Sequence, residues 1–458
     1  MEVDLKNLTE GSLLKHLLNL AIPTIGGMIA FSIFNITDTY FVGKLGTNAL
    51  AAMGFTFPVV MVAGAVSVGV STGAASLLSR AYGKKDNEEM RRIATNGILL
   101  AMVIVAVFTP LGLLTMDSLF TLLGAESDIL PMIKSYMTIW YGCVVVVMMP
   151  PVCDGAMRAV GDTIRPFKVM LICAILNIIL DPIFIFGWLG VPAMGIKGAA
   201  IATIISRFIG MLASLYYNHY HHNLIDWKVP KLDELLSSWS GIIRIAVPSI
   251  GVTLLPQLIR IALTAFSATI GGTVYVAAVA VGTRIEGFAL VISMAIGSSI
   301  VPLIGQNYGA GELLRVREIQ RLISKSAIII GIGMFATMSF ASEPLIKLFT
   351  TNPELIEISK LYLIVVTLGS AGLNLYNFNS HSLNAIGLSK ESLLINVLGT
   401  VALILPLMFI GAQYSFFGML LGLVAGQLIV GLCSNYYVKN IFKFKHLETS
   451  EKTLLYKL

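Results

Sequence analysis

Long apolar runs separated by short polar breaks dominate this chain of 458 residues. A helix needs about 20 apolar residues to cross the roughly 30 Å of hydrocarbon in a membrane, and most of the runs have about that length. The pattern predicts twelve spans, near residues 17–41, 55–78, 93–115, 129–152, 166–186, 195–217, 239–270, 277–303, 319–340, 355–379, 393–411 and 417–437. We therefore expect an all-α, polytopic membrane protein.

The composition agrees with this pattern. Hydrophobic residues make up 56% of the chain and charged residues 12%, with a mean hydropathy of +0.84, which excludes a water-soluble globular protein. The N-terminal lead has mixed charge and continues into the first span, so we expect no cleaved signal peptide. Most lysines and arginines fall in alternate breaks, which indicates that both termini are cytoplasmic. This rule explains the net charge of +6, and we expect no nucleic-acid binding.

The chain contains an internal repeat. Three pairs of similar segments recur at a nearly constant offset: AIPTIGGMIAF and AVPSIGVTLLP (Pro23 and Pro248), SRAYGKKD and GQNYGAGE (Tyr82 and Tyr308), and RAVGDT and NAIGLS (Gly161 and Gly387). An offset that contains an even number of spans gives parallel repeats, typical of alternating-access transporters. We expect two pseudo-symmetric six-helix lobes at 1–222 and 239–440, a cytoplasmic linker at 223–238 and a tail at 441–458.

Two aspartates lie deep inside apolar spans, Asp38 in FSIFNITDTYFVG and Asp181 in LNIILDPIFIF. A carboxylate in hydrocarbon is costly enough that function is its first explanation, although polar contact between helices is the alternative. Each follows a proline at the start of its span, Pro23 or Pro166, by the same interval, which places both at roughly 22 Å along their helices. Neither aspartate has an acidic counterpart in the second half of the chain, so we expect any coupling-ion site to lie in the first half.

Two further polar residues fit the same site. Asn177 precedes Asp181 by one helical turn on the same face, and Thr203 reaches a similar depth on the next span. Two carboxylates, an amide and a hydroxyl form an all-oxygen set that suits Na+. The set suits a proton equally, because two carboxylates close together in a low dielectric do not both remain ionised.

The segments NITDTYFVGKLG, LNIILDPIFIFG and GIKGAAIAT, together with the double repeat, resemble the multidrug and toxic compound extrusion (MATE) family over essentially the whole chain. The resemblance implies a V-shaped pair of six-helix lobes that exports organic cations in exchange for H+ or Na+, with no other cofactor. It is greatest to the branch with essential acids in the first lobe, where Asp38, Asn177, Asp181 and Thr203 match the cation-site positions. Another branch carries an acid on the seventh or tenth helix, and this chain has none at the centre of either.

Several residues are candidates for contact with substrate. Aromatic and methionine side chains suit flat, lipophilic cations, so we expect a first-lobe cavity lined by Asn35, Tyr40, Tyr136, Trp140 and Met148, with ordinary packing as the alternative. Asp154 is either a solvated loop carboxylate or a drug ligand.

The second half carries fewer polar candidates. Arg260, Arg284 and Glu286 form either an interhelical ion pair or part of a substrate site, and Asn374 and Asn377, with Asn379 and His381, line a possible cleft. The histidines of NHYHHNL, His219, His221 and His222, are accompanied by no carboxylate or cysteine partner at metal spacing, so we expect a solvated loop and no metal site.

We expect a multidrug exporter in a prokaryotic plasma membrane, a monomer whose partners are organic cations and membrane lipids. The drug binds while Asp38 and Asp181 are charged, and H+ or Na+ then enters the site, rearranges the first helix and expels the drug. One alternative is a flippase for lipid-linked precursors. An intramembrane aspartyl protease also pairs two buried carboxylates, but Asp181 stands in ILDP where such enzymes have GxGD, so we expect no enzyme.

Overall fold

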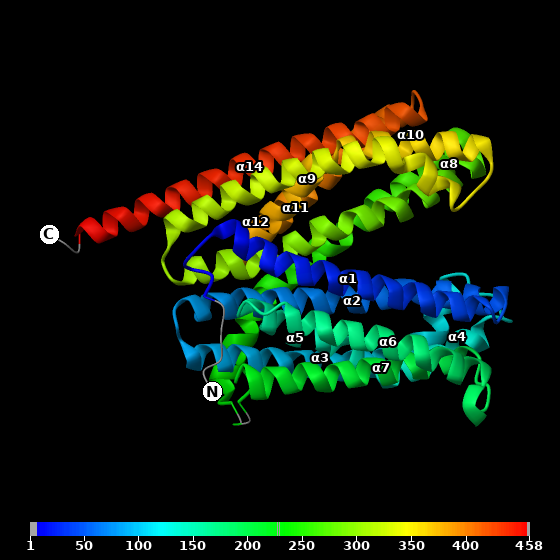
Figure 1. The fold of residues 1–458 in the computed structure, drawn as a ribbon, viewed down its shortest axis with the longest axis horizontal. Helices are drawn as coiled ribbons and strands as arrows, with labels where there is room; N and C mark the ends of the chain where they lie inside the picture. Colours follow the sequence, from blue (N-terminus) through cyan, green and yellow to red (C-terminus); the bar gives the residue numbers. More distant parts are fainter. Residues whose placement is uncertain (1–6, 227, 229, 456–458) are drawn as a thin grey trace. The chain divides into compact units, whose positions relative to one another are not determined.

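The computed structural model describes residues 7–226, 228 and 230–455, the last twelve by their backbone alone. Helices make up nearly all of the part described, and no strand occurs in it (Figure 1). The α-helices are α1 (Leu13–Gly43), α2 (Thr47–Gly83), α3 (Asn87–Leu122), α4 (Leu130–Gly142), α5 (Val145–Ala159), α6 (Ile164–Phe186), α7 (Ile196–Tyr216), α8 (Leu232–Gly309), α9 (Leu313–Lys347), α10 (Pro353–Leu368), α11 (Ser370–Ala385), α12 (Ser389–Val397), α13 (Leu405–Ala412) and α14 (Phe416–Leu455). Three short segments, η1 (Trp188–Gly190), η2 (Tyr217–His221) and η3 (Leu398–Ile404), complete the order. The predicted all-α class is confirmed.

The number of membrane crossings follows from the lengths of these helices. Among the described residues, nine helices are long and apolar enough to span a membrane, or eleven if each of two bent helix pairs is one span. At 1.5 Å per residue the 78 residues of α8 would extend to about 117 Å as one rod, several times the thickness of the hydrocarbon. Its backbone breaks at Gly271 and Gly272. With α8 counted as two crossings, the described helices match the twelve predicted spans.

The internal repeat is visible in the backbone. Helices α4 and α5 form a pair bent by 46°, and α10 and α11 form a pair bent by 50°. Gly142, which ends α4, and Leu368, which ends α10, are separated by the offset of the sequence repeat. Gly161 and Gly387, the glycines paired in the sequence, have φ values of 87° and 86°. This left-handed conformation favours glycine, so the same turn is built at both places.

Contacts divide the chain into two compact units. Unit 1 contains residues 1–7, 22–82 and 86–246, and unit 2 contains residues 8–21, 83–85 and 247–458. The first turns of α1 therefore belong to unit 2, and the first turns of α8 belong to unit 1. The two boundaries, after Ala21 and after Ala246, are also separated by the offset of the sequence repeat, so the exchange follows that repeat.

Hydrogen bonds hold each exchanged segment. In unit 2, Leu8 N donates to Gln306 Oε1 over 3.2 Å, and Asn307 Nδ2 donates to Leu8 O over 3.1 Å. In unit 1, Trp239 Nε1 donates to Asn96 O over 2.9 Å. Helix α8 thus begins within 223–238, where a linker was expected, and α14 continues through most of 441–458, where a tail was expected.

Helices α6 and α7 form the close pair that carries most of the polar site in unit 1. They run side by side (Figure 1). Gly198 permits this contact, because a Cβ there would lie 2.3 Å from Phe184 O. Gly187 caps α6 with φ 79°, the left-handed conformation typical of a glycine cap, and a connection that contains η1 leads into α7.

Candidate functional site

The four residues predicted to bind the coupling ion all lie in unit 1. Asp38 is on α1, Asn177 and Asp181 are on α6, and Thr203 is on α7. All four are buried, the two α6 side chains completely. These positions follow from helix packing, because α6 and α7 are antiparallel neighbours joined by a short connection.

The carboxyl group of Asp181 interacts with both Asn177 and Asp38. Asn177 Nδ2 donates to Asp181 Oδ1 over 3.0 Å, the contact that their spacing of one helical turn predicts. Asp38 interacts electrostatically with Asp181. Ala30 and Phe34 of α1 also pack in one buried cluster with Ala174 of α6, so the two helices are in contact in this part of unit 1. Thr203 lies on the helix packed along α6.

Each of these side chains has an oxygen atom without a partner. Among the described residues, the buried atoms Asp38 Oδ1, Asn177 Oδ1, Asp181 Oδ2 and Thr203 Oγ1 have no hydrogen-bond partner. An unsatisfied buried polar group costs roughly 1–3 kcal/mol, more if it is charged, so four in one region need an explanation. All four atoms are acceptors or hydroxyl oxygens. They fit a bound hard cation or a proton, and they have the ligand chemistry that Na+ prefers.

The ligand set at this site differs from that of a transition-metal site. No group of three or more His, Cys, Asp or Glu side chains that could hold a metal ion exists within the described residues. Only two of the four groups are carboxylates, and the others are an amide and a hydroxyl, so the set favours a monovalent cation over Zn2+.

Tyr136 on α4 is next to the site, although the sequence assigned it only to the drug cavity. It interacts electrostatically with both Asp38 and Asp181. The sequence gives no signal for this interaction, because the residue is far from Asp38 along the chain and lies on a helix with its own apolar face.

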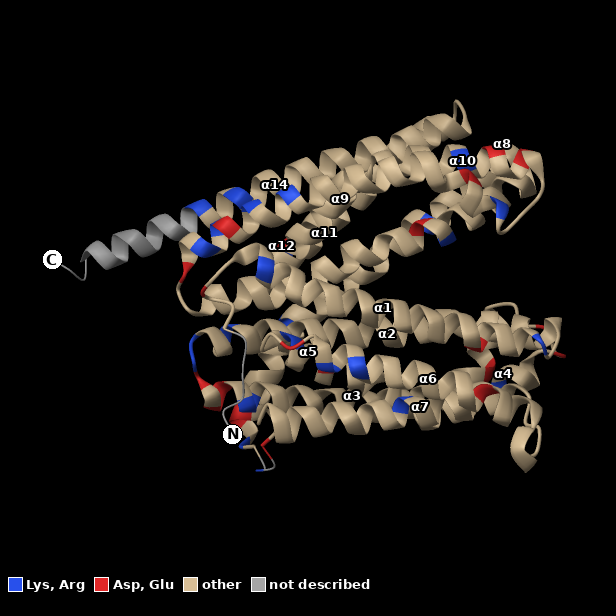
Figure 2. Ribbon diagram, viewed as in Figure 1, with Lys and Arg blue, Asp and Glu red and all other residues tan. Residues whose placement is uncertain are grey.

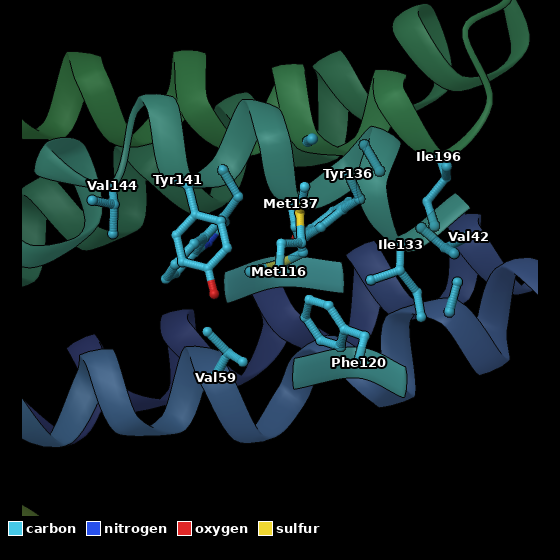
Figure 3. Packing of buried hydrophobic residues seen from close by; sticks show 14 of the residues in the cluster. Val42, Val59, Met116, Phe120, Ile133, Tyr136, Met137, Tyr141, Val144 and Ile196 are labelled. Atoms are coloured by element: carbon cyan, nitrogen blue, oxygen red, sulfur yellow. The ribbon is translucent and has the colours of Figure 1, made fainter. Parts of the chain in front are cut away.

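The residues predicted to line a drug cavity fall into two groups. Tyr136, Trp140 and Met148 are buried in the hydrophobic core of unit 1, and Figure 3 shows Tyr136 among the packed side chains of α4. Asn35 and Tyr40 are exposed on α1, and Asn35 Nδ2 donates to Phe31 O. A lining role for these residues stays a prediction.

Asp154 lies within α5, so the expectation of a loop carboxylate is wrong. Ser214 Oγ donates to Asp154 Oδ1 over 2.9 Å. Arg158 and Arg207 interact with the same carboxylate. The Arg207 guanidinium also lies 4.5 Å from the ring centroid of Phe34 on α1, at cation-π distance. Unit 1 therefore contains a second charged cluster besides the aspartates.

The histidine segment is not a solvated loop, and this expectation is also wrong. His221 ends the π-helical segment η2, and His222 is buried. His222 Nε2 lies 3.0 Å from Asp162 Oδ2, and Arg165 contacts both Asp162 and His221. Burial raises the pKa of Asp162, but the hydrogen bonds from His222 and Arg165 outweigh burial and hold the pKa well below its usual range. The sequence missed this pair because its members are far apart along the chain.

The charged residues predicted for the second half lie on α8 in unit 2. Glu286 Oε2 accepts a hydrogen bond of 2.8 Å from Tyr362 Oη. Arg260 interacts with Glu286 electrostatically, without a direct ion pair in the part of unit 2 that is described. Arg260 and Arg284 are exposed. The expected interhelical ion pair is therefore replaced by a tyrosine hydrogen bond.

Asn379 of α11 belongs to a buried polar network, and Asn374 Nδ2 donates to Ala327 O of α9. Asn374 is fully buried and Asn377 is half-buried. Gln320 Nε2 donates to Asn379 Oδ1 over 2.7 Å, and Asn379 Nδ2 donates to Ser434 Oγ over 3.0 Å. Helices α9, α11 and α14 are thus joined inside unit 2, and a cleft role for Asn374 and Asn377 stays a prediction.

Comparison with known proteins identifies the family. The family described as MatE matches residues 23–183 and 248–410, one match in each half of the repeat. The chain is 33% identical over 426 residues to the FAD transporter of Shewanella oneidensis, with 93% of this chain and 94% of that protein covered. It is 28% identical to the probable multidrug resistance protein NorM of Thermotoga maritima, with 90% and 89% covered.

Solved structures agree with this assignment. The crystal structure of the Vibrio cholerae MATE transporter VcmN in the bent form is similar, with a TM-score of 0.88, 29% identity, and coverage of 95% of this chain and 98% of that chain. Members of this family are transporters and not enzymes. The matches cover most of the chain and both of its repeats, and the chain belongs to the MATE family of transporters.

Proposed function

We propose that this protein is a secondary active multidrug exporter that exchanges lipophilic organic cations for H+ or Na+ by alternating access. The four buried and unpartnered oxygens of Asp38, Asn177, Asp181 and Thr203 carry the proposal. The Thermotoga maritima relative named as a probable multidrug resistance protein, NorM, supports the substrate class. We also propose that the protein is a monomer in a prokaryotic plasma membrane. Both termini are then cytoplasmic, an orientation that the distribution of lysine and arginine supports.

The proposed mechanism uses competition for two carboxylates. While Asp38 and Asp181 are charged, unit 1 attracts a cationic drug. A proton or Na+ that enters the site neutralises this charge and satisfies the unpartnered oxygens. The drug then loses its electrostatic attraction, α1 rearranges around Asp38, and the drug leaves on the outer side. The same two charges cannot hold the ion and the drug at once, so entry of the ion is coupled to release of the drug. The free energy for export therefore comes from movement of the ion down its gradient.

Efflux of ethidium from cells tests this proposal. The variants are Asp38→Asn and Asp181→Asn, and the matched control is Asp117→Asn. Asp117 is an exposed carboxylate that pairs with Lys134 at 2.8 Å, so its loss has a small effect on stability. We expect efflux driven by an imposed pH or Na+ gradient in the wild type and the control, and none in the two site variants. The gradient that drives efflux identifies the ion. Normal efflux by both site variants would refute the proposed site.

Export of a flavin dinucleotide is a second candidate. The Shewanella relative is named an FAD transporter, and FAD combines planar rings with an anionic pyrophosphate. In unit 1, Arg158 and Arg207 are half-buried on α5 and α7, and arginine binds phosphate groups through paired hydrogen bonds. This candidate predicts that expression raises the flavin dinucleotide in the medium and that Arg207→Gln abolishes the rise. An unchanged level in the medium would exclude it.

A further inference from the structure

A cavity in unit 2 has no part in the functions proposed so far. It lies between α9 and α14 and has a volume of about 260 Å³. Its basic lining residues are Arg317 and Arg321 from α9 and Lys439 and Lys443 from α14. Figure 2 shows lysines and arginines gathered at this end of the two helices. The cavity is smaller than the roughly 300–1,000 Å³ typical of drug-sized ligands, so it suits a smaller group.

Helix geometry explains why these four cations meet. Arg317 and Arg321 are one turn apart on one face of α9, and Lys439 and Lys443 are one turn apart on one face of α14. Farther along both helices, Ser324 Oγ donates to Asn435 Oδ1 over 2.8 Å and fixes α9 against α14. The basic faces are therefore held toward each other.

The four cations lack neutralising partners. Among the described residues, none of them forms an ion pair, and no acidic side chain lines the cavity. Like charges held close together repel each other, and an anion bound between them would relieve this repulsion. The positive-inside rule explains why lysine and arginine occur on one side of the membrane. It does not explain their convergence on one cavity.

A buried amide at the cavity adds a second, independent signal. Gln320 lines the cavity with only 2% of its surface exposed, and its Oε1 has no hydrogen-bond partner among the described residues. Its Nε2 is already used, since it donates to Asn379 Oδ1 over 2.7 Å. Gln320 Oε1 therefore needs a donor such as a hydroxyl group. A ligand that combines an anionic phosphate with a hydroxyl would satisfy both the four cations and Gln320.

Exposed apolar side chains extend from the cavity along both helices. On α14, Tyr436 and Leu432 precede Lys439 by about one and two turns, on the same side of the helix, and both are exposed. On α9, Ile328 follows Arg321 by about two turns and is also exposed. These positions would contact acyl chains, so they favour a lipid over a free phosphate ion.

We propose that this cavity binds the headgroup of an anionic phospholipid with a hydroxylated headgroup, such as phosphatidylglycerol. The phosphodiester lies among the four basic side chains, a headgroup hydroxyl donates to Gln320 Oε1, and the acyl chains follow the exposed apolar faces of α9 and α14. Basic pockets between helices at the cytoplasmic surface are known to bind anionic lipid headgroups. The site does not depend on the proposed coupling ion or on the proposed drug.

Lipid binding to the purified, delipidated full-length protein in a neutral detergent tests this proposal. Native mass spectrometry measures the affinity for dioleoylphosphatidylglycerol and for dioleoylphosphatidylcholine, with inorganic phosphate as a soluble competitor. The cavity variant combines Arg321→Gln with Lys439→Gln. The matched control combines Arg92→Gln with Lys390→Gln, which removes the same charge from exposed residues that do not line the cavity.

We expect the wild type to prefer phosphatidylglycerol and inorganic phosphate to compete poorly. The cavity variant should bind phosphatidylglycerol roughly 30-fold more weakly, because each of the two basic residues near an anionic headgroup changes affinity by about fivefold. The control should bind as the wild type does. A second pair, Lys439→Gln with Lys443→Gln, changes only exposed side chains of α14 and keeps the test valid if the first variant fails to fold.

Three results would overturn the proposal. Equal weakening in the cavity variant and the control would show a nonspecific charge effect. Equal affinity for the two lipids would exclude headgroup recognition. Displacement of the lipid by inorganic phosphate at low millimolar concentration would make a free anion the ligand. Retained binding by Arg321→Lys combined with Lys439→Arg, which preserves the charges, would support a role for charge at these positions.

Discussion

The hydroxyl group of Thr203 tests the claim that unit 1 keeps unsatisfied oxygens for an ion. Thr203 Oγ1 is buried and has no hydrogen-bond partner among the described residues. A buried hydroxyl without a partner costs roughly 1–3 kcal/mol. Valine has nearly the same shape and lacks the hydroxyl, so Thr203→Val should increase the stability of the ion-free protein by about that amount.

The expected change in melting temperature follows from this free energy. In a folding unit of about 150–250 residues, 1 kcal/mol shifts Tm by about 2–4 °C. We therefore expect Thr203→Val to raise Tm by roughly 2–12 °C in a buffer with choline in place of sodium. Scanning fluorimetry of the purified protein in detergent measures the shift.

A second threonine gives a matched control of opposite sign. Thr56 on α2 is also buried, but its Oγ1 donates to Met53 O over 2.8 Å. Thr56→Val loses this hydrogen bond, worth about 0.5–1.5 kcal/mol, so its Tm should fall. If Na+ is the coupling ion, Na+ should raise the Tm of the wild type and raise that of Thr203→Val much less. A fall in Tm for Thr203→Val like that of Thr56→Val would refute the reasoning.

Two further predictions concern packing and pH. A Cβ at Gly331 would lie 2.4 Å from the backbone of Ala371, so Gly331→Ala should lower the free energy of unfolding by about 1–3 kcal/mol. Gly333 has open space around it, so Gly333→Ala should be neutral or stabilising. Thermal unfolding compares the two variants. The pKa of Asp162 is lower in the folded protein than in the unfolded chain, where an aspartate has a pKa of about 4. The charged carboxylate therefore stabilises the fold above about pH 4, and this stabilisation is lost progressively as the pH falls toward the pKa of the folded protein. Asp162→Asn should therefore reduce Tm at neutral pH and reduce it by less as the pH is lowered below about 4, while Asp233→Asn, an exposed control, should leave Tm nearly unchanged throughout.

The sequence predicted those parts of the molecule that depend on local pattern. Run length indicated the spans, and the constant offset of Pro23 and Pro248 indicated the repeat that the bent helix pairs confirm. The Asn177–Asp181 hydrogen bond follows from helical spacing alone. Each of these features is decided by residues near one another or by a regular period.

Contacts between distant segments could not be predicted in this way. The His222–Asp162 contact joins two residues on either side of α6 and α7, and the basic cavity joins α9 to α14 across four intervening helices. Whether Arg317 faces Lys439 depends on the rotation of two helices about their axes, which packing decides. The exchange of the first turns of α1 and α8 between the units could not be predicted for a similar reason, because hydropathy does not show which unit the end of a helix contacts.

Ion release on drug binding tests most directly the claim that Asp38 and Asp181 bind the coupling ion in competition with the drug. Tetraphenylphosphonium is added to the purified protein in weakly buffered solution, while a pH indicator and a sodium electrode record the ions set free. We predict that the wild type and Asp117→Asn release H+ or Na+ in a fixed ratio to bound drug, and that Asp38→Asn and Asp181→Asn release neither. The same release from both site variants would contradict the account.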